Sequence, residues 1–273
     1  MLTMSSVYAQ GDYFTESGQK MTRQTPPRDG IYDRTMHTEK RLLPYDFVHE
    51  RDVMWEKRIW REIDVRQKMN HIFRYPKAHL ISILLDEAKT GNVTLYSPWN
   101  DEFTEPLNQT DISTLGCSVD SVLIYDPITF EERLEIVKSE MDPDDVIRYR
   151  IKEVWYFDSE TSRLNVRILG IAPIINRYDE EGNLLHSAPM FWAYYPELRH
   201  SLVHHEVFND RNDAARFTWD DIFEARMFAS HITKASNIHD KRLQDDYTGI
   251  DILLEADKIK QEIFNFEHDL WSY

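Results

Sequence analysis

The chain of 273 residues contains little cysteine and little glycine. Its one cysteine, Cys117, cannot form an intramolecular disulfide or a multi-cysteine zinc site, and no neighbouring residue marks it as a nucleophile. With 8 glycines, phosphate-cradling loops are hard to build, and the sequence has no Walker A loop, GxGxxG turn or GxSxG elbow. The motifs of nucleotide-binding enzymes and α/β-hydrolases are therefore missing.

Long apolar runs and positive charge are also scarce. No uninterrupted apolar run is long enough to cross a bilayer. The 48 acidic residues outnumber the 32 lysines and arginines, which gives a net charge of −16. Such a chain repels phosphate backbones and anionic lipid surfaces, so we expect no nucleic-acid partner and no direct membrane insertion. A hydrophobic content of 41% nevertheless excludes disorder over the whole chain.

The N-terminal part of the chain differs from the rest. Val7-Tyr8-Ala9 followed by Gln10 has the form of a signal-peptidase site, so residues 1–9 are interpreted as a signal-peptide remnant or start region. Residues 10–46 are polar and irregular, with Thr25-Pro26-Pro27 as a breaker, and they predict an extended or disordered arm. Residues 47–273 are predicted to form a single domain.

Helical patterns open this domain. From Arg51 to His71, apolar residues recur every four positions at Trp55, Ile59 and Ile63, which predicts a helix. Residues 80–88 have the apolar face of a second helix, which Gly91-Asn92 should end. The weaker patterns that follow predict short strands at residues 93–96 and 121–125 and a short helix at residues 128–138.

The centre of the chain has the alternation of β-strands. Apolar and basic residues alternate from Ile147 to Phe157, and a second alternating stretch runs from Leu164 to Tyr178. The turn at residues 179–183 contains a glycine, and a further strand follows at residues 188–195. Such short connections force antiparallel neighbours, so the pattern predicts a β-meander.

Helices are expected again after Pro196. Thr218 should cap a helix over residues 219–230. The last helix has an a/d seam that should dock on the sheet or, alternatively, pair with another helix; the seam is Ile252, Ala256, Ile259, Ile263, Phe266 and Leu270. The predicted fold class is therefore α+β, with a central antiparallel β-meander flanked by N-terminal and C-terminal helices.

One pair of histidines has the spacing of metal ligands. His200 and His204 are four residues apart, so on a helix they would share one face, as zinc ligands do. The residues between them are Ser201, Leu202 and Val203, so the glutamate of an HExxH motif is missing. A periplasmic metal-dependent hydrolase is thus one alternative function, and surface histidines are the plainer interpretation.

An aromatic strand is the second unusual feature. In the stretch Phe191-Trp192-Ala193-Tyr194-Tyr195, alternation places large aromatic side chains on both faces. Helices of the same chain could cover each face, or one face could meet a partner protein, since Trp and Tyr often dominate interfaces. An aromatic pocket for a small molecule is a further alternative.

Several longer strings resemble the GldN/PorN family of gliding motility and type IX secretion proteins. The resemblance extends over residues 46–273 and is carried by residues 52–64, 149–158, 191–199, 208–213, 221–228, 254–260 and 264–273.

The resemblance implies a non-enzymatic periplasmic structural subunit without a cofactor. It implies binding to the outer-membrane lipoprotein GldK (PorK), on the inner face of the outer membrane, in a ring-like complex with further copies of the chain. The ring would be coupled to the motor proteins GldL and GldM, and the periplasmic part of GldM would be a further partner. We expect Trp192, Tyr194 and Arg199 to contribute to the lipoprotein contact, because aromatic residues beside an arginine are enriched at interface centres. The arm, residues 10–46, is expected to bind a neighbouring subunit.

Overall fold

The computed structural model describes residue 31 and residues 39–115, 117–125, 132–178, 184–212, 214–215 and 217–270. The chain divides into two units, Met1–Met36 and His37–Tyr273, and the fold below is that of the second unit. The predicted start region, residues 1–9, lies outside the described residues, as does most of the predicted arm.

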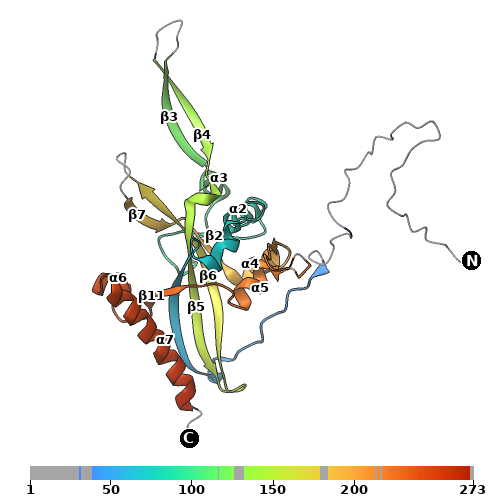
Figure 1. Cartoon of the computed structure of the whole chain (residues 1–273), viewed down its shortest axis with the longest axis vertical. Helices are drawn as coiled ribbons and strands as arrows, with labels where there is room; N and C mark the ends of the chain where they lie inside the picture. The colour runs from blue at the N-terminus through green and yellow to red at the C-terminus, as the bar shows by residue number, and fades with distance from the viewer. Residues whose placement is uncertain are drawn as a thin grey trace, which may run out of the picture. The chain divides into compact units, whose positions relative to one another are not determined.

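A large antiparallel sheet forms the centre of the fold, as predicted (Figure 1). Its strands follow the order β11-β1-β5-β6-β8-β2, and β7 also pairs with β6. The meander of β5, β6 and β7 is confirmed, because consecutive strands pair antiparallel. The strands are β1 Val53–Asp64, β2 Leu95–Tyr96, β5 Val146–Asp158, β6 Arg163–Tyr178, β7 Leu184–Pro189, β8 Trp192–Tyr194 and β11 His231–Ala235.

Helices precede and follow the central strands, so the predicted α+β class is confirmed. The α-helices are α2 Leu80–Lys89, α3 Gln109–Leu115, α4 Tyr195–Leu202, α5 Trp219–Glu224, α6 Leu243–Asp246 and α7 Ile250–Leu270. Three short 3-10 helices are η1 Glu50–Asp52, η2 Lys68–Arg74 and η3 Pro143–Asp145. A small separate ladder pairs β9 Glu206–Val207 with β10 Phe217–Thr218.

The helix predicted from Arg51 to His71 is wrong, because most of this stretch is the long strand β1. A spacing of four residues is a multiple of two, so Trp55, Ile59 and Ile63 share one face of a strand as well as one face of a helix. Pairing with β5 along almost the whole of β1 decides between the two. The pattern alone could not, since the partner strand lies about a hundred residues away.

Two helix ends follow local rules. Gly91 adopts a φ of 79° after α2, and the Asn92 N–H donates to the Glu87 carbonyl at 3.0 Å, which confirms the predicted stop. Thr218 caps α5 in a reciprocal capping box with Asp221, also as predicted. The helix ends at Glu224 rather than near residue 230, because Arg226 adopts a φ of 53° and closes the same kind of C-terminal motif.

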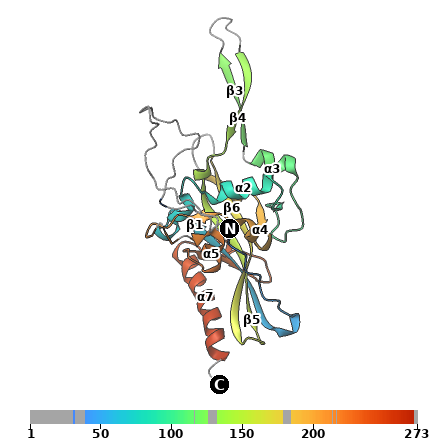
Figure 2. The same ribbon diagram turned by 90° about the vertical axis from the view of Figure 1, so that its right-hand side faces the viewer.

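A two-stranded hairpin is formed by β3 Cys117–Tyr125 and β4 Glu132–Glu140. The strand predicted at residues 121–125 is confirmed, and the helix predicted at residues 128–138 is wrong where the structure describes it. Leu134 and Ile136 alternate with charged residues, which is the two-residue period of a strand. Backbone pairing with β3 then favours a strand over a helix. In Figures 1 and 2 the hairpin leads away from the large sheet.

One face of the sheet has the main core. Helices α2, α4 and α5 contribute buried apolar side chains to it, together with Ile63, Tyr149, Ile151 and Ile171 of the sheet. Helix α7 packs on the same face, where Ile59 and Ile232 meet Ala256, Ile259 and Ile263. The predicted docking of the last helix on its own sheet is thus confirmed.

Candidate partner interface

The aromatic strand β8 is inserted between β6 and β2, so backbone pairing fixes both of its edges. Ala193 pairs with Ile171 on one side and with Leu95 on the other. The predicted alternation is confirmed, because Phe191, Ala193 and Tyr195 are fully buried in the main core. The side chains of Trp192 and Tyr194 therefore face the opposite side of the sheet.

On that opposite face, a loop covers the aromatic side chains instead of a helix. This segment, residues 97–106, is called the aromatic loop. The Ser97 N–H donates to the Glu105 carbonyl at 2.9 Å, which brings the two ends of the loop together. Trp192 is 2% exposed and packs with Trp60 and Ala172 beneath the loop. Trp192 thus supports the loop from below and presents almost no surface itself.

Phe103 anchors the aromatic loop to the sheet. Its ring centroid lies 5.3 Å from that of Tyr194, 6.1 Å from that of Trp192 and 5.7 Å from that of Tyr96. Its backbone has a φ of 58°, which is uncommon for a bulky residue. A Cβ added to Gly170 would lie 2.5 Å from the ring, so only glycine lets Phe103 sit on β6.

Replacing Gly170 by alanine is expected to displace Phe103 and to lower the free energy of unfolding by about 1–3 kcal/mol. The aromatic loop should then be cleaved faster in limited proteolysis, because its anchor on the sheet is lost. Gly91→Ala is the matched control, since a Cβ there meets nothing within 4 Å while its φ of 79° strains the backbone. Cleavage of Gly170→Ala at the wild-type rate would contradict the anchoring.

Charged groups hold the loop as well. Lys152 is buried under it and lies 5.5 Å from the Trp60 ring centroid and 5.4 Å from that of Phe103. Its Nζ is 3.4 Å from Oδ1 of Asp101, whose carboxylate also accepts a hydrogen bond from the Trp60 indole. Cation–π contacts and a partly buried ion pair therefore fix the loop on the sheet.

Trp99 is the part of the aromatic loop that reaches solvent. Its side chain is 92% exposed, and the neighbouring Tyr96 and Tyr194 are half-buried. Exposure of this size is unusual for tryptophan. Trp99 and Phe103 were not predicted as interface residues from the sequence, because an irregular loop has no periodicity. The signal that could have found Trp99 is its place in the polar string Ser-Pro-Trp-Asn-Asp.

The third predicted interface residue, Arg199, lies in a different place. It projects from α4 towards α5, is 5% exposed, and its Nε is 2.9 Å from Oδ1 of Asp220. The Tyr195 hydroxyl donates to the same oxygen at 3.3 Å. Burial opposes the charged form, but the hydrogen bond to Asp220 and the nearby negative charges raise the pKa of Arg199. The structure thus keeps Trp192 with Tyr194 and separates Arg199 from both.

Arg199 also holds an extended segment, residues 39–49, which is called the strap. Its guanidinium carbon lies 4.1 Å from the Tyr45 ring centroid, and the Tyr45 hydroxyl donates to Glu224. Burial and the Glu224 carboxylate both raise the pKa of Tyr45, so the phenol keeps its proton.

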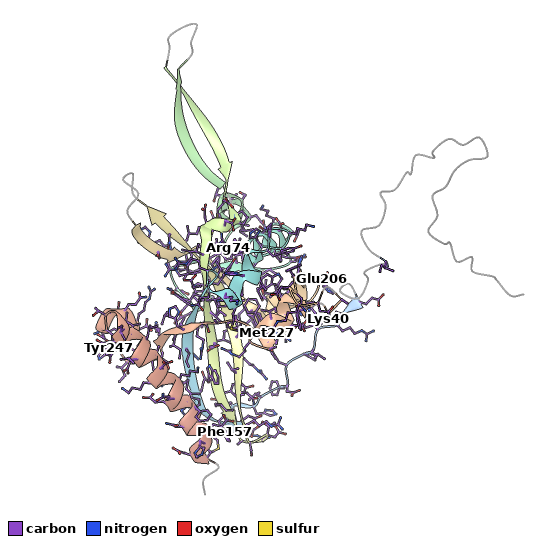
Figure 3. The ribbon with its side chains drawn as sticks, viewed as in Figure 1. Lys40, Arg74, Phe157, Glu206, Met227 and Tyr247 are labelled. Atoms are coloured by element: carbon purple, nitrogen blue, oxygen red, sulfur yellow. The ribbon has the colours of Figure 1, made fainter. Side chains whose placement is uncertain are left out.

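A lysine and a backbone carbonyl extend this contact. Lys40 pairs with Asp221, and Arg167 donates to the Asp46 carbonyl; Figure 3 shows Lys40 where the strap meets the helices. Burial would raise the pKa of Asp221, but hydrogen bonds from Lys40 and Thr218 outweigh it and hold that pKa below its usual range. The end of the predicted arm therefore binds its own chain.

The two candidate metal-ligating histidines lie at the surface. His200 is exposed on α4 and His204 is exposed just after it, beside a cavity of about 480 Å³ that Glu87 also lines. The Glu87 carboxylate accepts from Ser201 at 2.9 Å and lies 3.1 Å from Nε2 of His205. Among the described residues, no group of three His, Cys, Asp or Glu side chains could hold a metal ion.

One comparison with known proteins identifies the family of the chain. In the part of the chain that the structure describes, no helix is both long and apolar enough to cross a membrane. No curated protein matches the chain significantly. The model of one protein family, described as gliding motility associated protein GldN, matches residues 48–272. That range includes the strap's last residues, the whole sheet and all the helices named above. The chain therefore belongs to the GldN family and is a component of the gliding motility and type IX secretion machinery.

Proposed function

We propose that the chain is a non-enzymatic structural subunit in the periplasm, which binds a GldK-type outer-membrane lipoprotein within a ring coupled to the GldL and GldM motor. The observation that supports this proposal is the family match over residues 48–272. The export signal expected at Ala9-Gln10 is consistent with a periplasmic location.

The lipoprotein contact is proposed at the aromatic loop. Trp99 and Tyr194 offer aromatic surface there, while Trp192 supports it from beneath. Aromatic side chains held on a rigid base lose little entropy on binding, which makes them effective interface anchors. Arg199 is buried between α4 and α5, away from the aromatic loop. A substitution of Arg199 would therefore affect partner binding through the position of the strap.

The arm is proposed to bind a neighbouring copy within the ring. The strap, which follows the arm's first residues in the sequence, is held on the domain, because Lys40 pairs with Asp221 and the Tyr45 hydroxyl donates to Glu224 of α5. Deleting residues 10–36 should therefore leave the domain folded but reduce assembly beyond one copy of each partner. Full-size rings from the deleted chain would remove this part of the proposal.

The experiment is co-expression with the GldK-type lipoprotein of the same organism, followed by affinity purification and size-exclusion chromatography. A stable complex much larger than one copy of each protein is expected. Trp99→Ala should weaken the lipoprotein's affinity at least about tenfold without changing the fold, because an exposed side chain contributes little to stability.

Met69→Ala is the matched control, since Met69 is also a large apolar residue that is mostly exposed, and it lies on η2, away from the aromatic loop. Its affinity for the lipoprotein should equal that of the wild type. A chain that stays monomeric beside the lipoprotein would overturn the proposed function. Wild-type affinity of Trp99→Ala would overturn the proposed contact alone.

A further inference from the structure

Helix α7 has a second apolar face that its own sheet does not cover. Its inward face buries Ala256, Ile259 and Ile263. Its outward face exposes larger side chains, with exposed fractions of 75% for Ile250, 54% for Leu253, 61% for Leu254 and 66% for Phe264. In Figure 1, α7 lies at the outer edge of the described fold. The helix thus turns more large apolar side chains to solvent than to its core.

The exposed residues form one continuous stripe. Ile250, Leu253 and Leu254 are followed at intervals of three and four residues by Asp257, Gln261 and Phe264, which places all six on one side of the helix. This set is called the outer stripe. It extends for about 21 Å along the axis, at 1.5 Å per residue. A stripe of this length and period has the form that packs against another helix.

The inward packing of α7 is firm enough to hold the stripe in place. Phe266 stacks on Trp55 with ring centroids 4.6 Å apart and also meets Phe157 at 6.3 Å. Lys57 of β1 pairs with Glu262 at 3.3 Å. Figure 3 labels Phe157 beside the far end of the helix and Tyr247 ahead of its start. The stripe is therefore presented on a fixed element and not on a loose tail.

Charge decides which kind of partner fits. Six acidic residues of α7, Asp251, Glu255, Asp257, Glu262, Glu267 and Asp269, stand against two lysines, Lys258 and Lys260. Lys258 is already paired with Glu255 at 3.1 Å. A second copy of the same helix would bring like charges together, and an anionic lipid surface would be repelled. A partner with lysines or arginines beside its apolar residues would meet attraction instead.

We propose that the outer stripe of α7 binds an amphipathic helix of a different protein, whose apolar face is flanked by lysine and arginine. Asp257, in the middle of the stripe, receives one of these cations. Leu254 and Phe264 are the apolar anchors, one on each side of it. The surface lies on the opposite side of the sheet from Trp192 and the aromatic loop, so it does not depend on the lipoprotein contact proposed there.

The first test is site-specific photo-cross-linking in the native cell, with p-benzoylphenylalanine placed at position 254 or at position 264. Both positions are expected to give an adduct with the same protein. Mass spectrometry should place the adduct in a segment with helical apolar periodicity and flanking lysines or arginines. The same probe at Leu43, an exposed strap residue, should not label that segment. Adducts with a second copy of the chain, adducts with lipid, or no adduct would overturn the proposal.

The second test measures the affinity of the protein identified in this way for purified variants. Leu254→Gln with Phe264→Gln, and separately Asp257→Lys, should each weaken binding at least about tenfold. Asp251→Lys, which makes the same charge change off the stripe, should remain within about twofold. Circular dichroism should show the same helix content in all the variants. An equal loss in Asp251→Lys and Asp257→Lys would show non-specific charge attraction and overturn the proposed contact. Since the complex with the lipoprotein is measured separately, failure here leaves the proposed function intact.

Discussion

Replacing Arg199 by leucine is expected to lower the free energy of unfolding by about 3–5 kcal/mol. The substitution leaves the buried Asp220 carboxylate without the guanidinium that lies 2.9 Å from it. It also removes the cation stacked on the Tyr45 ring, so the strap loses one of its anchors. Urea denaturation measures the first effect, and the rate of proteolysis within residues 39–49 measures the second.

Two further variants separate the charge from the packing. Arg199→Lys keeps the positive charge but loses the planar group that reaches Asp220 and Tyr45 together, so its stability should lie between wild type and Arg199→Leu. Combining Arg199→Leu with Asp220→Asn should cost less than the sum of the two single changes, because no charge remains buried and unpaired. A loss below about 1 kcal/mol for Arg199→Leu would contradict this account of the pair.

The burial of Arg199 also changes how partner contacts can be tested. In the sequence, Arg199 follows Trp192 by seven residues and Tyr194 by five, so all three were predicted to form one lipoprotein interface. The chain turns between them, since β8 ends at Tyr194 and α4 begins at Tyr195. Arg199 consequently points to α5, while Trp192 faces the other side of the sheet. Substitutions of either residue disturb the fold first, so Trp99 is the better probe of a partner.

Most of the central fold could be predicted because its signals are local. The alternation in β5 and β6 repeats over more than ten residues, and short polar turns leave antiparallel pairing as the one connection that fits. The cap at Thr218 and the stop at Gly91 depend on residues within one helical turn. The docking seam of α7 is a strict repeat over the whole helix.

The errors share one physical cause. Strand β1 and strand β4 are both decided by a partner strand, and sequence periodicity alone does not contain the partner. The exposed stripe of α7 is hard to predict for a related reason. The a/d seam predicts the face that docks on the sheet, but it does not show which of the other residues stay uncovered. The aromatic loop has no period at all, and tertiary contacts to Gly170 and Lys152 fix it.

Glu153→Ala should be the second severe substitution, with an expected loss of about 3–5 kcal/mol in the free energy of unfolding. Glu153 is 0% exposed in the middle of β5. Its carboxylate accepts from Arg61 and from the Trp155 indole at 2.9 Å, and Nη2 of Arg226 lies 2.8 Å from its other oxygen. Removing it leaves two guanidiniums, each within about 6 Å of the Trp155 ring centroid, without the carboxylate that they share.

The control is a variant that removes the buried charges together. Arg61→Met with Glu153→Leu fills a similar volume without a buried ion pair, and Arg226 is exposed enough to turn to solvent. Replacing a whole buried pair by apolar residues is often neutral, so this double variant should be more stable than Glu153→Ala. Urea denaturation of both variants gives the two free energies of unfolding to compare. If the double variant is the less stable of the two, the cluster does more than neutralise charge. It would then act as a directional network that joins β1 and β5 to the turn after α5 and so holds α5 against the sheet.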